Sequence, residues 1–391
     1  MAQSRKNRLD ILVGLSRSFG GNLDMVQGGG GNTSVKVDNN KMYIKASGFP
    51  LRSVNSDNFI LVDTCEVLDI LCDGCGLTSD VNSRDEFVRK RISALVPHDL
   101  GKRPSIEVFL HALLGKYVIH LHPVYINALI CLRNGRSMAE ELFKGINFLW
   151  VDYNSPGYPL GISLQVGIEN HRAKYGAAPD VVFLKNHGLI ISCDNDQAVY
   201  PLLNRVMKKA ERFFEGNHVF DTSPQKINSD YVNRLSEAFR SAAVSDRWLS
   251  LSDSPVIDSS FCSKDPIVQL MPGSLYPDHV VYCGEEPLFI NATAGDDELK
   301  SCLMGFINKL GYAPKVIVFK DTGVVLSGDS VAEIGAIREV LEAHLKTLYL
   351  IREKGQPLFL SDSDISYLAQ WESEKYRRRF ISTISGTEGN N

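Results

Sequence analysis

The spacing of apolar and polar positions predicts alternating strands and helices over residues 8–214. Short β-branched or alternating runs predict strands, whereas apolar positions three or four residues apart predict helices. Strands are predicted at 33–37, 42–45, 59–63, 118–121, 149–153, 181–184 and 188–191. Helices are predicted at 8–19, 82–95, 107–114, 126–131, 160–175 and 196–214. The mixture indicates an α/β fold.

Two histidines end one of these strands, in the order His120-Leu-His122. Side chains alternate along a strand, so both imidazoles point to one face, with Cα atoms roughly 6.5–7 Å apart. Two imidazoles at this spacing can bind one metal ion. Upstream, Glu107 and His111 are four residues apart and share a helix face. Glu107 is therefore a candidate ligand or base. The alternative is a wetted strand face without a metal.

A third histidine, His187, lies in a polar turn between the apolar strands 181–184 and 188–191. An imidazole between two buried strands, beside Gly188, requires a polar partner. A shared metal ion would supply that partner. We therefore treat His187 as the third candidate ligand.

A glycine run, Gly28–Gly31, precedes Asn32, Thr33 and Ser34. Consecutive glycines can expose successive backbone N–H groups, which is the chemistry of an anion-binding nest. The run is neither a Walker A loop nor a dinucleotide fingerprint, because no helix start follows it. The alternative is a flexible entry to a hairpin.

Part of the chain recurs at an offset of 135 residues. Val181–Asp194 aligns with Val316–Asp329, with the same lysine, glycine, serine and aspartate positions and matching apolar strands. His187 is replaced by Thr322. We infer a duplicated strand–turn–strand–helix unit whose second copy lacks metal ligands. Chance similarity of two buried hairpins is the alternative.

The same offset would carry His120 and His122 to Pro255 and Ile257, neither of which binds metal. Insertions between the two copies make this part of the alignment loose. The expectation is that the second copy lacks all three histidines.

Length and composition indicate two domains of an ordinary globular protein. The chain has 391 residues, 44% hydrophobic and 23% charged, which is longer than one average core. We expect one domain at 1–222 and a smaller α/β domain at 231–391, joined by a polar linker over 215–230. The tail after Tyr376 is expected to be disordered.

Charge and targeting signals exclude several classes of partner. The net charge of −4 gives no electrostatic reason to expect nucleic acid. The basic run Arg377–Arg379 is interpreted as a solvated helix end. No stretch of about 18 apolar residues is present, so no membrane span is expected. Among eight cysteines only Cys72 and Cys75 form a CxxC, interpreted as a turn. With no signal-peptide core, we expect a cytoplasmic protein.

Five motifs occur in a specific order and combination. Through these motifs the sequence resembles the class II aldolase and adducin N-terminal family over about residues 8–220. The motifs are Gly31–Ser34, Ala46–Gly48, Ser105–His111, His120–His122 and Asn186–Gly188. The family's sugar-phosphate members include fuculose-1-phosphate and rhamnulose-1-phosphate aldolases. The long form resembles the aldolase portion of rhamnulose-phosphate aldolase/dehydrogenase fusions. The resemblance implies a three-layer αβα fold around a central, mostly antiparallel sheet, with the second domain as a degenerate repeat.

The resemblance also implies a set of site residues. His120, His122 and His187 match the ligands of a divalent, zinc-type metal. Glu107 matches the catalytic acid/base, which can also ligate the resting metal, and Tyr153 matches a proton donor reaching across a subunit boundary. The phosphate-binding positions match Gly31, Asn32, Ser47, Gly48 and Ser105. Where aldolases often have Ser-Ser-Glu, this chain has Ser-Ile-Glu, which removes one phosphate hydroxyl.

The implied function is a metal-dependent lyase that cleaves a ketose phosphate or related polyol phosphate through a metal-stabilised enediolate. Three neutral imidazoles leave the metal its full charge as a Lewis acid, and Glu107 is placed to move a proton. The alternatives are an epimerase, dehydratase or decarboxylase of the same family, or a non-catalytic adducin-like binding protein. Because adducins lack the metal histidines, the resemblance favours an enzyme. A small sugar or sugar-phosphate substrate and a homo-oligomer, tetramer or dimer, are expected.

Overall fold

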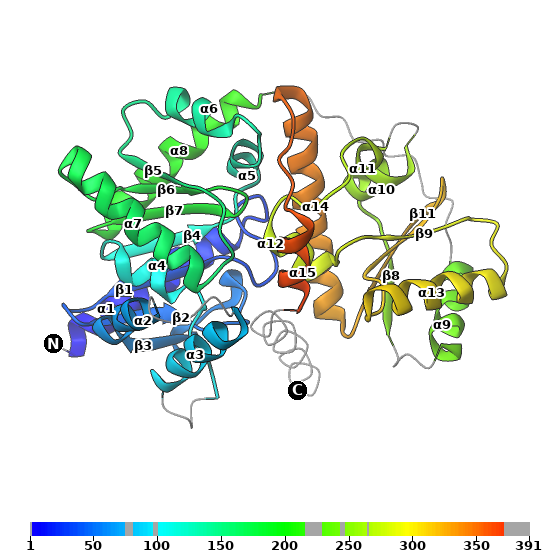
Figure 1. Cartoon of the computed structure of the whole chain (residues 1–391), viewed down its shortest axis with the longest axis horizontal. Coiled ribbons are helices and arrows are strands. Elements are labelled where there is room, and N and C mark those ends of the chain that lie inside the picture. The colour runs from blue at the N-terminus through cyan, green and yellow to red at the C-terminus, as the bar shows by residue number, and fades with distance from the viewer. Residues whose placement is uncertain are drawn as a thin grey trace. The chain divides into compact units, whose positions relative to one another are not determined.

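The computed structural model describes residues 2–74, 81–96, 101–215, 229–242, 247–263 and 266–370. The chain divides into two units, Met1–Glu215 and Gly216–Asn391, and both are drawn in Figure 1. Cys75, most of the predicted linker and the tail with Arg377–Arg379 lie outside the described residues.

Seven strands form the sheet of the first unit, in the order β3-β2-β1-β4-β7-β6-β5. Every neighbouring pair is antiparallel except β5 and β6, which are parallel. The strands are β1 (Asn32–Lys36), β2 (Lys41–Lys45), β3 (Phe59–Asp63), β4 (Tyr117–Leu121), β5 (Phe148–Val151), β6 (Val181–Leu184) and β7 (Gly188–Cys193). The predicted mostly antiparallel central sheet is confirmed.

Helices cover both faces of this sheet, which gives three layers (Figure 1). One group, α2, α3, α4 and α7, packs together against β2, β3 and β5, and the other group contains α1, α5, α6 and α8. The helices are α1 (Ala2–Gly20), α2 (Thr64–Gly74), α3 (Val81–Ala94), α4 (Val108–Leu113), α5 (Val124–Ile130), α6 (Gly135–Leu142), α7 (Tyr158–Tyr175) and α8 (Val199–Phe213). Short 3-10 turns are η1 (Leu51–Ser53), η2 (Ser56–Asn58) and η4 (Asp196–Ala198).

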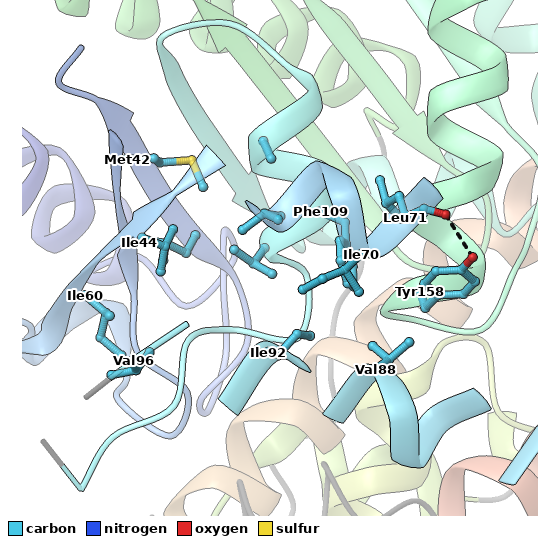
Figure 2. Packing of buried hydrophobic residues seen from close by; sticks show 14 of the residues in the cluster. Met42, Ile44, Ile60, Ile70, Leu71, Val88, Ile92, Val96, Phe109 and Tyr158 are labelled. Atoms are coloured by element: carbon cyan, nitrogen blue, oxygen red, sulfur yellow. Dashed lines mark hydrogen bonds between the residues drawn. The ribbon is translucent and has the colours of Figure 1, made fainter. Parts of the chain in front are cut away.

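Apolar side chains from β2, β3 and the first helix group form one buried cluster, shown in Figure 2. Met42 and Ile44 alternate along β2 and are fully buried against this helix layer, where Phe109 of α4 also packs. The hydroxyl of Tyr158, at the start of α7, donates to the carbonyl of Leu71 in α2 at 3.1 Å. Each fully buried apolar side chain contributes about 1.5–3 kcal/mol. This cluster holds α4 against the sheet, and α4 carries part of the site.

Several local predictions were wrong in their detail. Helix α4 begins at Val108, so Glu107 occupies its N-cap position. The hydroxyl of Ser105, two residues earlier, accepts from the backbone N–H of Glu107 at 3.3 Å. Cys72 lies in α2 and not in a turn. Helices α2 and α6 were not predicted, and the predicted helix 196–214 is the 3-10 turn η4 followed by α8.

The second unit contains a four-stranded sheet in the order β8-β11-β10-β9. Its strands are β8 (Trp248–Leu251), β9 (Leu288–Ile290), β10 (Val316–Phe319) and β11 (Gly323–Gly328). Its helices are α9 (Ser229–Ser241), α10 (Pro255–Cys262), α11 (Ile267–Leu270), α12 (Pro277–Cys283), α13 (Asp296–Leu310), α14 (Val331–Lys354) and α15 (Asp362–Gln370). The pairing senses of β8-β11-β10-β9 are those of β4-β7-β6-β5, including one parallel edge pair.

The similarity between the units extends to the backbone conformation of single residues. Asn186 (φ 53°) and Asp321 (φ 56°), which are 135 positions apart, are the non-glycine residues with positive φ in the described chain. Gly176 and Gly311, at the same offset, end α7 and α13 in the left-handed conformation. The backbone hydrogen bond that closes each hairpin turn measures 3.0 Å in both units. These agreements support a duplication of the strand–turn–strand–helix unit.

The strand register changes which residues of the second copy correspond to His120 and His122. His120 on β4 and Leu251 on β8 pair with residues of β7 and β11 that are themselves 135 positions apart. Leu251 is therefore the counterpart of His120, and Asp253 is the counterpart of His122. The predicted counterpart Pro255 was wrong, because the offset at this strand is 131. With threonine in place of the third histidine, the second copy still lacks the three imidazoles.

Candidate metal centre

Three histidines from two places in the sheet converge at one end of it. His120 and His122 lie at the end of β4, and His187 lies in the turn between β6 and β7. One nitrogen from each ring can be chosen so that all three lie within 4.8 Å of one another. The Nε2 atoms of His120 and His122 are 3.0 Å apart. All three side chains are buried. The structure thus brings together the residues predicted to bind metal.

Gly188 makes this convergence possible. A Cβ atom at this position would lie 2.6 Å from the carbonyl oxygen of Leu121, 2.7 Å from Cδ2 of His122 and 3.0 Å from Cε1 of His120. Contacts this short would displace either the strand or the rings. A glycine directly after His187 therefore allows β7 to pack against the two histidines of β4.

Ring nitrogens of the cluster are arranged as metal ligands usually are. Nδ1 of His120 lies 3.0 Å from the carbonyl oxygen of Leu189, which can only accept, so Nδ1 carries the proton and Nε2 has the free lone pair. Burial lowers the pKa of His120 to about 3, so the ring is neutral. Nδ1 of His187 is buried and has no hydrogen-bond partner among the described residues. A set of three imidazoles beside a carboxylate fits a divalent metal such as Zn²⁺.

Glu107 contributes that carboxylate, with only 3% of the residue exposed. Its Oε1 lies 2.9 Å from Nε2 of His187, and its Oε2 lies 3.5 Å from Nε2 of His120. Burial raises the pKa of Glu107, but the neighbouring histidines lower it more, so that its pKa lies well below the ordinary value. Glu107 is therefore ionised, and its carboxylate oxygens lie beside the space that the three imidazole rings surround. It can act as a ligand or as a base.

A chain of hydrogen bonds orients Glu107. Asn32 Nδ2 donates to Glu107 Oε2 at 2.6 Å and to the hydroxyl of Ser105 at 3.2 Å. The amide oxygen of Asn32 accepts from Nε2 of His111, and Nδ1 of His111 lies 2.7 Å from the hydroxyl of Ser34. Burial lowers the pKa of His111 to about 3, so this ring is neutral and carries one proton. That proton points at Asn32, and the ring accepts from Ser34.

Neither His111 nor Ser34 was predicted to have a role in the site. Two signals were present: His111 follows Glu107 by four residues in the helical register, and Ser34 follows Asn32 by two on the same strand face. What the sequence could not show is that the two signals belong to one network. They meet because β1 pairs with β4, beside α4.

The residues predicted to bind phosphate fall into two adjacent segments. Gly31 has φ 64°, and a Cβ on it would lie 2.9 Å from the carbonyl oxygen of His120, so it adjoins the end of β4. The backbone N–H of Ser47 donates to the carbonyl of Arg103 at 2.9 Å. Ser47 and Gly48, which has φ 91°, therefore run beside the segment that contains Ser105.

One expectation about the glycine run was wrong. The four glycines are buried, and the N–H of Gly30 donates to the carbonyl of Gln27 at 3.0 Å within the turn. The run therefore does not present four successive free N–H groups. An anion that binds here would rely on fewer backbone donors and on side chains from the neighbouring segments.

Tyr153 follows β5 in the chain and is half-buried. The last residue of β5, Val151, pairs with Leu184 at the end of β6, three residues before His187. Tyr153 therefore stands at the same end of the sheet as the histidines. Its part in a reaction stays a prediction.

Fold and site together define a three-layer α/β protein with a candidate metal centre at the end of its central sheet. Residues 11–202, about half of the chain, match the Class II Aldolase and Adducin N-terminal domain. The match covers the β-sheet and all three histidines. The resemblance seen in the sequence motifs is confirmed.

The chain is similar in sequence or structure to several known proteins, which match different shares of its length. The uncharacterized oxidoreductase YuxG of Bacillus subtilis (strain 168) is 23% identical over an alignment of 416 positions, which covers 94% of this chain and 58% of that protein. The chain thus spans little more than half of this relative. The N-terminal class II aldolase domain of a conserved protein from Thermoplasma acidophilum is 24% identical, covers 53% of this chain and 93% of its own, and has a TM-score of 0.44. L-fuculose-1-phosphate aldolase from Thermus thermophilus is 13% identical, covers 53% and 94%, and has a TM-score of 0.35.

None of the helices in the described part of the chain combines the length and the apolar character needed to cross a membrane.

Proposed function

We propose that the chain is a metal-dependent carbon–carbon lyase that cleaves a ketose phosphate or a related polyol phosphate. The observation that carries the proposal is the convergence of His120, His122 and His187 around the oriented carboxylate of Glu107. The match to the class II aldolase family supports an enzymatic role. Because adducin-like binding proteins lack the metal histidines, a purely structural role has less support.

The chemistry requires both a Lewis acid and a proton carrier. A divalent cation such as Zn²⁺, held by the three imidazoles, would withdraw electron density from the oxygen atoms of the substrate. In retro-aldol cleavage the bond between the α and β carbons of the ketone breaks, and its electron pair passes to the ketone fragment as an enediolate. The hydroxyl on the other fragment loses its proton and becomes an aldehyde. Glu107, ionised at rest and fixed by Asn32, is placed to take up that proton and deliver it to the carbon of the enediolate.

Substrate positioning is assigned to the segments beside the metal ligands. Gly31, Asn32, Ser47, Gly48 and Ser105 would hold the terminal phosphate, which orients the reacting carbon. Asn32 and Ser105 already bond to each other at 3.2 Å, and Asn32 also holds Glu107. Phosphate binding at these residues would therefore be coupled to the orientation of the acid/base.

Two variants test the proposal after purification and loading with Zn²⁺. His120→Ala should reduce bound metal well below one equivalent per chain and abolish turnover. Glu107→Gln should keep the metal but lower kcat by about 10²–10⁴-fold, which is typical for loss of a general acid/base. His171→Ala is a matched control, because His171 is also buried but bonds to Asn147, outside the site. Metal content below one equivalent in the wild-type protein would refute the metal assignment.

A substrate panel separates the lyase from the alternatives within the family. Phosphorylated and free ketoses and sugar acids are screened with a coupled assay for dihydroxyacetone phosphate or an aldehyde product. A lyase releases both fragments, whereas an epimerase releases neither. Turnover without fragment release would support the epimerase, dehydratase or decarboxylase alternative.

The proposal includes a homo-oligomer, a dimer or tetramer, in which Tyr153 donates a proton in a neighbouring subunit's site. Glu107→Gln and Tyr153→Phe would each be nearly inactive alone. If the two residues act from different subunits, co-expression of both variants should restore up to about a quarter of the wild-type activity in mixed oligomers. No restoration, or a fully active monomer in solution, would contradict this arrangement.

A further inference from the structure

A second cavity lies wholly within the second unit and shares no residue with the metal centre. Its volume is about 520 Å³, within the range of small-molecule sites. Side chains from α10, α13 and α14 and from the edge strand β9 line it, and most of them are apolar. They include Phe261, Leu288, Phe306, Leu341 and Leu345. A cavity of this size with apolar walls can enclose a ring system.

Two stacked imidazoles form the polar part of its wall. The ring centroids of His279 and His344 are 3.7 Å apart, and the ring planes differ by 14°. Burial lowers the pKa of His279 to about 4, and burial followed by the neighbouring His279 lowers the pKa of His344 well below its ordinary value. Both rings are therefore uncharged near neutral pH.

The buried ring of His344 has one nitrogen engaged and one available. A hydrogen bond with the backbone of Gly273 occupies the ring, while Nδ1 has no partner among the described residues. Because a backbone carbonyl only accepts, the engaged nitrogen carries the proton and Nδ1 is an acceptor. Leaving a buried acceptor without a donor is unfavourable. A bound ligand with a donor would remove that cost.

Charged groups at the edge of the cavity neutralise one another. Lys309 and Glu286 form an exposed ion pair at 2.6 Å. Glu285 is also at the edge, and burial, then Glu286, raise its pKa. The described residues of the wall thus offer no unpaired cation for an acidic ligand, and the apolar interior offers no solvation to a charged one.

The corresponding hollow in the first unit is chemically different. His171 and Lys174 line it, at positions 135 before Phe306 and Lys309. There Nε2 of His171 already bonds to Asn147 at 2.7 Å. The duplicated fold leaves a hollow at this sheet edge in both copies, but the second copy has the apolar walls and the available acceptor.

We propose that this cavity of the second unit binds a neutral aromatic molecule with one O–H or N–H donor, which bonds to Nδ1 of His344. The aromatic ring packs against the phenylalanines and the stacked imidazoles, where ring pairs prefer offset or edge-on contact. The proposal does not depend on the reaction at the metal centre. It assigns the second unit a ligand site of its own.

p-Cresol and toluene are a matched pair of probes, since they differ by one hydroxyl. Binding to the full-length protein is measured by ligand-observed saturation-transfer NMR titration. We expect p-cresol to bind about tenfold more tightly than toluene, which corresponds to about 1.4 kcal/mol for one hydrogen bond to a buried acceptor. His344→Leu should abolish this preference and leave toluene binding within about twofold.

A second test uses two variants that leave His344 in place. A Cβ at Gly305 would meet no atom within 4 Å, so Gly305→Trp can fold and place its ring in the exposed mouth of the cavity. Asn308→Trp, on the same helix and exposed but not among the residues that line the cavity, is the control. Binding of both probes should fall at least tenfold in Gly305→Trp and persist in Asn308→Trp. The proposal is overturned by absence of saturable p-cresol binding, by wild-type binding in Gly305→Trp, or by a preference that survives His344→Leu.

Discussion

The hydrogen-bond chain behind Glu107 makes a quantitative prediction for His111→Leu. Leucine matches the imidazole roughly in volume, but it removes both of the ring's hydrogen bonds. Asn32 and Ser34 are 2% and 0% exposed, so water cannot replace the lost partner. An unsatisfied buried group costs about 1–3 kcal/mol. Because the amide oxygen of Asn32 and the hydroxyl of Ser34 both lose their partner, we expect a total loss of about 3 kcal/mol.

For a unit of this size, that loss lowers Tm by about 6–12 °C. Differential scanning calorimetry of the full chain measures it on the transition of the first unit. His171→Leu is the matched control, since it removes one hydrogen bond from a less buried network, and it should cost about 1 kcal/mol. A shift below 2 °C in His111→Leu would refute the reasoning.

A double-mutant cycle with Asn32→Leu tests whether the two side chains act together. His111→Leu leaves the amide oxygen of Asn32 buried without its partner, and Asn32→Leu does the same to Nε2 of His111. The double variant removes both atoms. The double variant should therefore be about 1–2 kcal/mol more stable than the sum of the single effects predicts. If Asn32 orients Glu107, His111→Leu should also lower kcat while bound metal is unchanged. Additive stability effects would show that the network is not a unit.

Three further outcomes follow from the structure. Gly188→Ala should lower Zn²⁺ content and affinity, measured by metal analysis, because its Cβ would collide with the strand and rings of the metal site; wild-type affinity would contradict this. Lys315→Met should destabilise the second unit by about 3 kcal/mol in urea unfolding, because it leaves Glu333 buried without its cation. Lys309→Met, which breaks an exposed ion pair, should cost under about 1 kcal/mol. Burial lowers the pKa of His279 from 6.5 to about 4, so the unfolded chain binds the proton more readily. Its contribution to stability is present above pH 6.5 and is lost as the pH falls toward 4, by about 2 kcal/mol at pH 5. His279→Gln should therefore show a smaller loss between pH 7 and pH 5, and an equal loss would refute the assignment.

Local patterns in the sequence were sufficient for much of the site. The two-residue period of a strand predicts that His120 and His122 share a face, and β4 places them so. A histidine beside Gly188 between two apolar strands predicts a tight turn with a polar role. The order of these motifs along the chain was enough to indicate the family, because each motif lies within one turn or one strand.

Local patterns failed where distant contacts decide the structure. Helix α6 was not predicted, and Cys72 was assigned to a turn although it lies in α2. The offset between the two copies changes from 135 to 131 at β8, which only the strand register reveals. An insertion leaves no trace in the local pattern of either copy, so Leu251 could not be matched to His120 from the sequence.

The sequence by itself determined the residue types of the metal site and the faces on which they lie, because strand and helix periods depend on neighbouring residues alone. Only the tertiary structure decided that Glu107 reaches His187 at 2.9 Å and that Asn32 bonds to both Glu107 and His111. Those contacts join residues 75 to 80 positions apart in the chain. They form because β1 pairs with β4 and α4 packs over the sheet. The same reason applies to His344 in the second unit, whose available nitrogen is defined by packing and not by any motif.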